Sequence, residues 1–174
     1  MIGDCRVKNL TPHASRLKPQ ASSLSAIVLC CGAGGWAAAG RGLPIRWIAV
    51  ADWAEDCLET WRVNHQRFDL DCALCRVDLA TAEGREKLVM AIGAHRIDLV
   101  VGGIPCEQLS TARGNVALRD GELDRLHALI DGVLGLVRRL RPRGWAIEDV
   151  VQIERHLPPP IDLGHDVPRR RIEA

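Results

Sequence analysis

A cysteine stands at the end of a predicted strand, in the run Asp98-Leu-Val-Val-Gly-Gly-Ile-Pro-Cys106. Pro105 restricts φ and has no N–H to donate, so it stiffens the turn just before the thiol. The two glycines allow a backbone or a ligand to come close. Because α/β folds hold their ligands at the carboxyl ends of strands, this pattern favours a nucleophilic thiol over a core cysteine.

A second predicted strand runs into a glycine-rich turn, Cys30-Cys-Gly-Ala-Gly-Gly35, and an alanine-rich helix follows. Such a turn bends tightly and lets a ligand approach the backbone N–H groups at the start of the helix. Seventeen residues after Gly35 (52 − 35), the strand Ile48-Ala-Val-Ala-Asp52 ends in a carboxylate. Acids at about this spacing accept hydrogen bonds from the ribose of adenosine-containing cofactors, so the pattern predicts such a cofactor.

The order of these features resembles the DNA cytosine-5 methyltransferase family. The family has Phe-x-Gly-x-Gly-Gly, then Pro-Cys-Gln, then Glu-Asn-Val, and this chain has Cys30-Cys-Gly-Ala-Gly-Gly35, Pro105-Cys-Glu107 and Glu148-Asp-Val150. The resemblance extends over residues 27–150. Departures are Cys30 for the phenylalanine, Glu107 for the glutamine and Asp149 for the asparagine. A negative Glu107 would oppose ionisation of the neighbouring thiol.

The resemblance implies a reaction and a set of residues. Cys106 would attack C6 of a cytosine flipped out of double-stranded DNA, and Glu148 would hydrogen-bond N3 and the exocyclic amine. C5 would then take the methyl group of S-adenosylmethionine and lose its proton. Asp52 would hold the ribose and Asp78 the adenine amine, although an N-cap for the following helix is the alternative for Asp78. The implied cofactor contacts are Cys30, Gly32, Gly34, Gly35, Asp52, Trp53, Asp78 and Pro105, with no metal.

The last part of the chain follows the family less closely. Val167-Pro-Arg-Arg-Arg-Ile-Glu173 is similar to the family motif Gln-x-Arg-x-Arg, in which Arg171 alone matches and would join the catalytic set. Family members carry a target-recognition domain beyond this point. We therefore expect a C-terminally incomplete catalytic domain over residues 26–174, completed by a second polypeptide, or a truncated, catalytically silent cofactor-binding remnant.

Composition and periodicity predict the architecture. With 174 residues and 47% hydrophobic content, one globular domain is expected, after a disordered or weakly attached lead over residues 1–25. Alternating strands and helices predict an α/β, Rossmann-like, doubly wound and mostly parallel sheet, implied by the resemblance to be the methyltransferase fold. Helix 120–140 has an apolar stripe that should pack on the sheet. The strands are expected near 27–31, 46–51, 74–77, 97–102 and 144–148, and the helices near 35–41, 53–66, 81–94 and 120–140.

Charge and cysteine content bear on the partners, the compartment and a metal site. A formal net charge of +1 does not indicate nucleic acid, although arginine clusters at 138–143 and 169–171 suit phosphate contacts. Seven cysteines without a secretory signal or a long apolar segment favour a reducing cytoplasm and no membrane contact. Cys72-Ala-Leu-Cys75 has the spacing of half a zinc site or a redox pair, and incidental spacing is the better interpretation. The resemblance implies DNA methylation, as in restriction-modification, and leaves tRNA open as the substrate.

Overall fold

Six strands form one sheet in the residues that the computed structural model describes, which are 5–6, 23–66, 72–105, 121–150 and 153. The strand order is β1-β4-β3-β2-β5-β6. β1 pairs antiparallel with β4, and every other pairing is parallel, so the predicted mostly parallel sheet is confirmed. The strands are β1 (Cys5–Arg6), β2 (Leu24–Leu29), β3 (Ile45–Asp52), β4 (Ala73–Arg76), β5 (Leu99–Gly103) and β6 (Gly144–Glu148).

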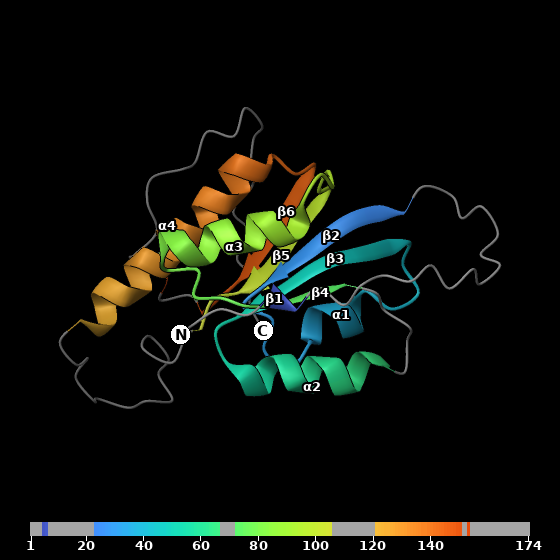
Figure 1. The fold of residues 1–174 in the computed structure, drawn as a ribbon, viewed down its shortest axis with the longest axis horizontal. Coiled ribbons are helices and arrows are strands. Elements are labelled where there is room, and N and C mark those ends of the chain that lie inside the picture. Colours follow the sequence, from blue (N-terminus) through green and yellow to red (C-terminus); the bar gives the residue numbers. More distant parts are fainter. Residues whose placement is uncertain (1–4, 7–22, 67–71, 106–120, 151–152, 154–174) are drawn as a thin grey trace.

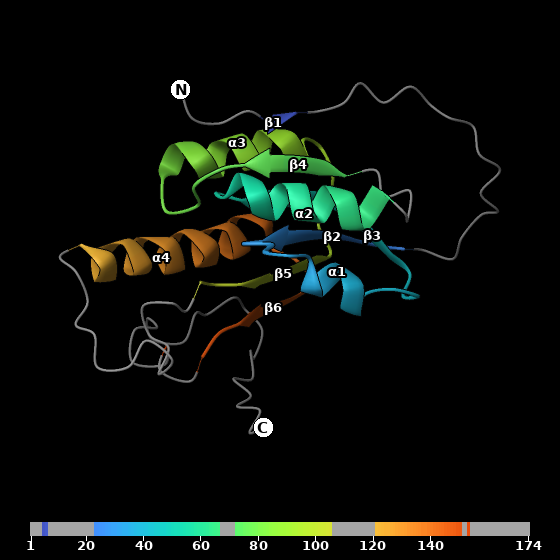
Figure 2. The same ribbon diagram turned by 90° about the horizontal axis from the view of Figure 1, so that it is seen from below.

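Helices cover both faces of the sheet (Figure 1). α1 (Gly35–Ala39) and α2 (Glu55–Gln66) lie on one face, and α3 (Ala82–Ile92) and α4 (Glu122–Leu140) lie on the other. Side chains alternate along a strand, so Ile27 and Leu29 join the core under α3 and α4, while Val28 joins the core under α1 and α2. Figure 2 shows the helices α2 and α4 running along the sheet in the turned view.

β2 begins at Leu24 and ends at Leu29, whereas the sequence pattern predicts residues 27–31. At the start, the backbone N–H and the hydroxyl of Ser25 donate to Asp98 Oδ2 at 3.1 and 2.9 Å, which ties β2 to the beginning of β5. At the end, Cys30 has a φ of 51°, in the left-handed region that interrupts a strand. Cys30 and Cys31 therefore belong to the turn. The sequence does not predict β1, because two residues show no periodicity.

α4 confirms the predicted apolar stripe, with Leu126, Ile130, Val133 and Val137 buried against the sheet. The other predicted helices and strands lie within two residues of their expected limits, as the bounds above show. α2 begins at Glu55 and not at residue 53, because Asp52 Oδ1 accepts the Ala54 N–H at 3.0 Å and holds this corner outside the helix.

Glycines allow close backbone approaches at three places. A Cβ on Gly132 of α4 would lie 2.1 Å from the Leu79 carbonyl oxygen, and one on Gly84 of α3 would lie 2.1 Å from the Asp78 carbonyl oxygen. A Cβ on Gly102 of β5 would lie 2.4 Å from the Leu29 carbonyl oxygen. No side chain fits at such distances, so the packing of α3 and α4 and the pairing of β2 with β5 depend on these glycines.

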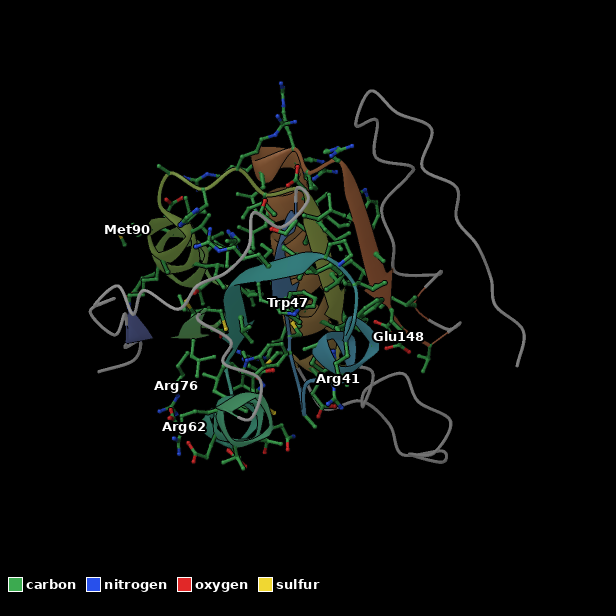
Figure 3. The ribbon with its side chains drawn as sticks, turned by 90° about the vertical axis from the view of Figure 1, so that its right-hand side faces the viewer. Arg41, Trp47, Arg62, Arg76, Met90 and Glu148 are labelled. Carbon is green, nitrogen blue, oxygen red and sulfur yellow. The ribbon has the colours of Figure 1, made fainter. Side chains whose placement is uncertain are left out.

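Two tryptophans belong to the core on the α1 and α2 face. The rings of Trp47 and Trp61 meet edge to face with centroids 6.3 Å apart, and both side chains are buried. Figure 3 labels Trp47 within the molecule. Within the residues placed by the structure, no helix combines the length and the apolar character needed to cross a membrane.

Candidate functional site

The carboxyl ends of the parallel strands meet along one edge of the sheet. β2 lies between β3 and β5, so the chain reverses its winding direction there, and α/β folds hold ligands in the crevice at such a switch point. Predicted site residues from five strands lie along this edge: Cys30, Gly32, Gly34 and Gly35 after β2, Asp52 and Trp53 at β3, Asp78 after β4, Pro105 after β5 and Glu148 at the end of β6. Cys106 and Arg171 lie outside the described residues.

The glycine turn after β2 needs glycine for its backbone. Gly32 has a φ of 48° and Gly34 a φ of 91°, values that side chains disfavour. Gly34 is also the N-cap of α1, and its N–H donates to the Cys31 carbonyl at 3.0 Å. Among the described residues, a Cβ on Gly32 or on Gly35 would meet nothing within 4 Å. There is therefore open space beside the turn for a ligand.

Asp52 links this turn to the corner between β3 and α2. Its side chain is 6% exposed, and its Oδ2 accepts the Gly32 N–H at 3.0 Å. Its Oδ1 accepts the Ala54 N–H at the same distance. The sequence predicts contact with a ribose and does not reveal these bonds, because Gly32 is 20 residues away along the chain. Each carboxylate oxygen keeps a further lone pair, so Asp52 can hold the turn and also accept hydrogen bonds from a ribose.

Asp78 is not the N-cap of α3, so that alternative is wrong. The N-cap is Thr81, whose hydroxyl oxygen accepts the Gly84 N–H at 3.0 Å. Asp78 Oδ1 instead accepts the Ala80 N–H at 3.0 Å, and its Oδ2 pairs with Arg125 at 3.0 Å. The local turn therefore fixes Asp78 two residues beyond the end of β4.

Trp53 lies next to Asp52, and 61% of its surface is exposed. The guanidinium of Arg125, from the first turn of α4, lies over this indole with Cζ 5.4 Å from the ring centroid. Sequence reasoning did not identify Arg125 as a site residue. Arg125 also pairs with Asp78, 47 residues away along the chain. No local sequence pattern signals contacts over such separations.

Three carboxylates act on the pKa of the Cys30 thiol. Burial raises the pKa of this thiol to about 12, and the charges of Asp52, Asp78 and Asp149 contribute to the rise. Burial and Asp52 likewise raise the pKa of the Cys31 thiol. Both residues therefore stay protonated at neutral pH and are poor nucleophiles. The same carboxylates make this edge of the sheet attractive to a cationic ligand.

Glu148 reaches the neighbouring strand that leads to Pro105. Gly103 and Glu148 are partners in the β5–β6 pairing, and the Ile104 N–H donates to the Glu148 carbonyl at 3.2 Å. A Cβ on Gly103 would lie 3.2 Å from Glu148 Oε2, so the carboxylate lies over this glycine. Figure 3 shows the Glu148 side chain at the end of β6.

Asp149 stands where the resembled motif has asparagine. Burial raises the pKa of its carboxyl to about 6, the neighbouring Glu148 adds to the shift, and the Val150 N–H donated to Oδ1 at 2.6 Å opposes it. Oδ2 is buried and has no hydrogen-bond partner among the described residues. Below about pH 6 the carboxyl is therefore protonated and neutral, as an asparagine amide is.

We expect Asp149→Asn to remove a pH-dependent loss of folding stability. In the unfolded chain the carboxyl ionises near 3.8 and in the folded chain near about 6, so the folded state becomes less stable as pH rises between these values. The cost is on the order of 1 kcal/mol, because half-exposed groups are partly screened. Thermal unfolding should place the variant about 2–4 °C above the wild type at pH 7 and level with it at pH 4. A difference independent of pH would contradict this assignment.

Cys72 and Cys75 join core clusters on opposite faces of the sheet. Cys75 is buried in the core under α3 and α4, while Cys72 packs against the core on the opposite face. In the described part of the chain, no group of three or more His, Cys, Asp or Glu side chains is arranged to hold a metal ion. The CxxC spacing thus belongs to no such group among these residues.

Comparisons with known proteins bear on the fold and the family. The sequence matches the family model for C-5 cytosine-specific DNA methylase over residues 24–157, and no match was found among curated proteins. A solved structure described as a DNA modification methyltransferase encoded within a prophage (E. coli) is similar, with a TM-score of 0.51 and 23% identity over 75% of this chain and 33% of that chain. A hydroxysteroid dehydrogenase from Escherichia coli has a TM-score of 0.51 and 14% identity over 76% of this chain and 58% of its own.

The structural likenesses establish the fold alone, since a methyltransferase and a dehydrogenase share it. The chain spans about a third of the length of that methyltransferase. The family model carries more information, because it covers most of the 174 residues, including the glycine turn and Glu148. The chain belongs to the C-5 cytosine-specific DNA methylase family.

Proposed function

We propose that this chain forms the cofactor-binding and catalytic part of a DNA cytosine-5 methyltransferase. The observation that carries the proposal is the placement of the glycine turn, Asp52 and Glu148 along one edge of the sheet, beside the strand that leads into Pro105 and Cys106. Such an edge places a cofactor and a nucleophile within reach of the same base.

The described residues fit S-adenosylmethionine, the methyl donor of C-5 DNA methylases. Gly32 and Gly35 leave open space beside the turn, Asp52 would hold the ribose, and Trp53 and Asp78 would hold the adenine. The carboxylates near Cys30 suit the sulfonium and ammonium groups of this cofactor.

In the proposed reaction Cys106, as a thiolate, forms a bond to C6 of the cytosine and pushes an electron pair toward C5. Glu148 holds N3 and the exocyclic amine, so that the ring accepts the charge. S-adenosylmethionine supplies an electrophilic methyl group when bound. The C5 proton then leaves to a base, and its electron pair re-forms the double bond as the thiolate departs. By resemblance, Arg171 joins this catalytic set.

Double-stranded DNA with the target cytosine flipped out is the proposed substrate, and a second polypeptide is the proposed source of target recognition. A catalytically silent S-adenosylmethionine-binding chain is the second candidate. The departures at Cys30, Glu107 and Asp149 favour this alternative, because each replaces a residue of the family motifs.

Methyl transfer decides between the two. The purified chain is incubated with labelled S-adenosylmethionine and either mixed-sequence DNA or tRNA, and the nucleosides are then separated. Label in 5-methyldeoxycytidine supports the proposal, and label only in RNA nucleosides replaces DNA by tRNA as the substrate. Binding of the cofactor without transfer supports either the silent alternative or a catalytic chain that needs the second polypeptide. Absence of both binding and transfer would overturn both candidates.

A further inference from the structure

Arg125 connects two side chains that the proposed function assigns to the adenine of the cofactor. Its guanidinium donates to Asp78 Oδ2 at 3.0 Å, and its Cζ lies 5.4 Å from the centroid of the Trp53 ring. Trp53 follows β3, Asp78 follows β4 and Arg125 belongs to α4. One planar cation from a helix therefore joins two adjacent strand ends at the candidate site.

These contacts are the ones that an adenine would need. An adenine ring is planar and stacks on an indole, and its 6-amino group donates hydrogen bonds to a carboxylate. A guanidinium offers the same two properties, since it is planar, lies over aromatic rings and donates to carboxylates. Arg125 thus presents to Trp53 and Asp78 the same surface and donors as the base.

The spacing leaves no room for both groups on the same face of the indole. Stacked planar groups lie about 3.5 Å apart, so a guanidinium above an adenine would lie about 7 Å from the indole. The observed distance to the centroid is 5.4 Å. Arg125 must therefore move from this face before a base can stack there.

We propose that Arg125 occupies the adenine position of the cofactor site and competes with the cofactor for Trp53 and Asp78. The inference rests on the proposed function, because that function assigns these two residues to adenine. Binding of the cofactor would displace the guanidinium from Asp78, whose carboxylate would then accept a hydrogen bond from the adenine amine. Arg125 then sets the affinity of the chain for its cofactor without contacting it.

Removing the competitor should strengthen binding. Arg125 is 55% exposed and Asp78 25% exposed, so Arg125→Ala removes an exposed cation–π pair and a partly screened ion pair. Together these two interactions correspond to roughly a three- to tenfold change in an equilibrium constant. We expect Arg125→Ala to lower the dissociation constant for S-adenosylhomocysteine by that factor.

Arg139→Ala is the matched control. Arg139 lies on the same helix, its side chain is similarly exposed, and it pairs with Glu86 of α3. The variant removes the same charge from α4 and leaves Trp53 and Asp78 untouched. Its dissociation constant should equal that of the wild type. Arg125→Lys, which keeps the charge but loses the planar group, should lie between the wild type and Arg125→Ala.

Isothermal titration of the full chain with S-adenosylhomocysteine tests the inference. Tighter binding by Arg125→Ala, with Arg139→Ala unchanged, supports it. Equal or weaker binding by Arg125→Ala overturns it and makes Arg125 a support for Trp53 and Asp78, while the proposed function stands. If neither the wild type nor Arg125→Ala binds, the proposed cofactor site itself is wrong and the inference falls with it.

Discussion

Replacing Cys106 by serine is expected to lower the rate of methyl transfer to cytosine by a factor on the order of 10³ or more. The thiolate is the nucleophile in the proposed reaction, and a serine hydroxyl without an activating base does not ionise at neutral pH. Because Cys30 and Cys31 are held protonated by burial and by nearby carboxylates, which raise the pKa of each thiol, neither can replace it. Label in 5-methyldeoxycytidine is the measurement.

DNA containing 5-fluorocytosine gives an independent measurement of the same step. Fluorine at C5 cannot leave as a proton does, so the bond between Cys106 and C6 should persist and retard the complex in a denaturing gel. Cys57→Ser is the control, because Cys57 lies on α2 and takes no part in the proposed reaction. Transfer or adduct formation that survives in Cys106→Ser would show that another residue is the nucleophile.

Replacing Asp52 by alanine should weaken binding of S-adenosylhomocysteine at least about tenfold and lower the free energy of unfolding by about 2 kcal/mol. The substitution removes the acceptor for the N–H groups of Gly32 and Ala54, in a place where the carboxylate is buried. The glycine turn and the corner before α2 would lose their common anchor. Titration calorimetry and urea unfolding measure the two effects.

Asp56→Ala provides the comparison for Asp52→Ala. Asp56 is an exposed acid in the first turn of α2, so its loss changes the charge by the same amount near the same corner. Only a small loss of helix stability is expected there. Wild-type affinity in Asp52→Ala would refute the assignment of this carboxylate to the cofactor, whatever happens to stability.

The sequence predicted the elements because their patterns are strong. The apolar runs of β2 and β3, and the stripe of α4 from Leu126 to Val137, can each be buried in only one simple arrangement. Strand ends then follow, and with them the common edge that collects Asp52, Asp78 and Glu148. The family match over residues 24–157 confirms the resemblance drawn from the motifs.

Contacts between distant residues could not be predicted in this way. Asp52 bonds to Gly32 across 20 residues and Arg125 to Asp78 across 47, and no local pattern fixes such distances. The pKa of Asp149 depends on how deeply the end of β6 buries it, which its residue type does not reveal. Sequence motifs thus identified the residues that a ligand would touch but not the residues that hold or compete for them.

Gly84, Gly102 and Gly132 have a consequence for mutational scanning. None of them carries a functional group, yet each lies against a carbonyl oxygen of the segments that bear the site, at Asp78, Leu29 and Leu79. In a library selected for activity alone, these positions would tolerate as few substitutions as catalytic positions do. Measuring protein abundance beside activity would separate the two classes, since glycine variants lose the folded protein whereas a variant of a purely chemical residue keeps it.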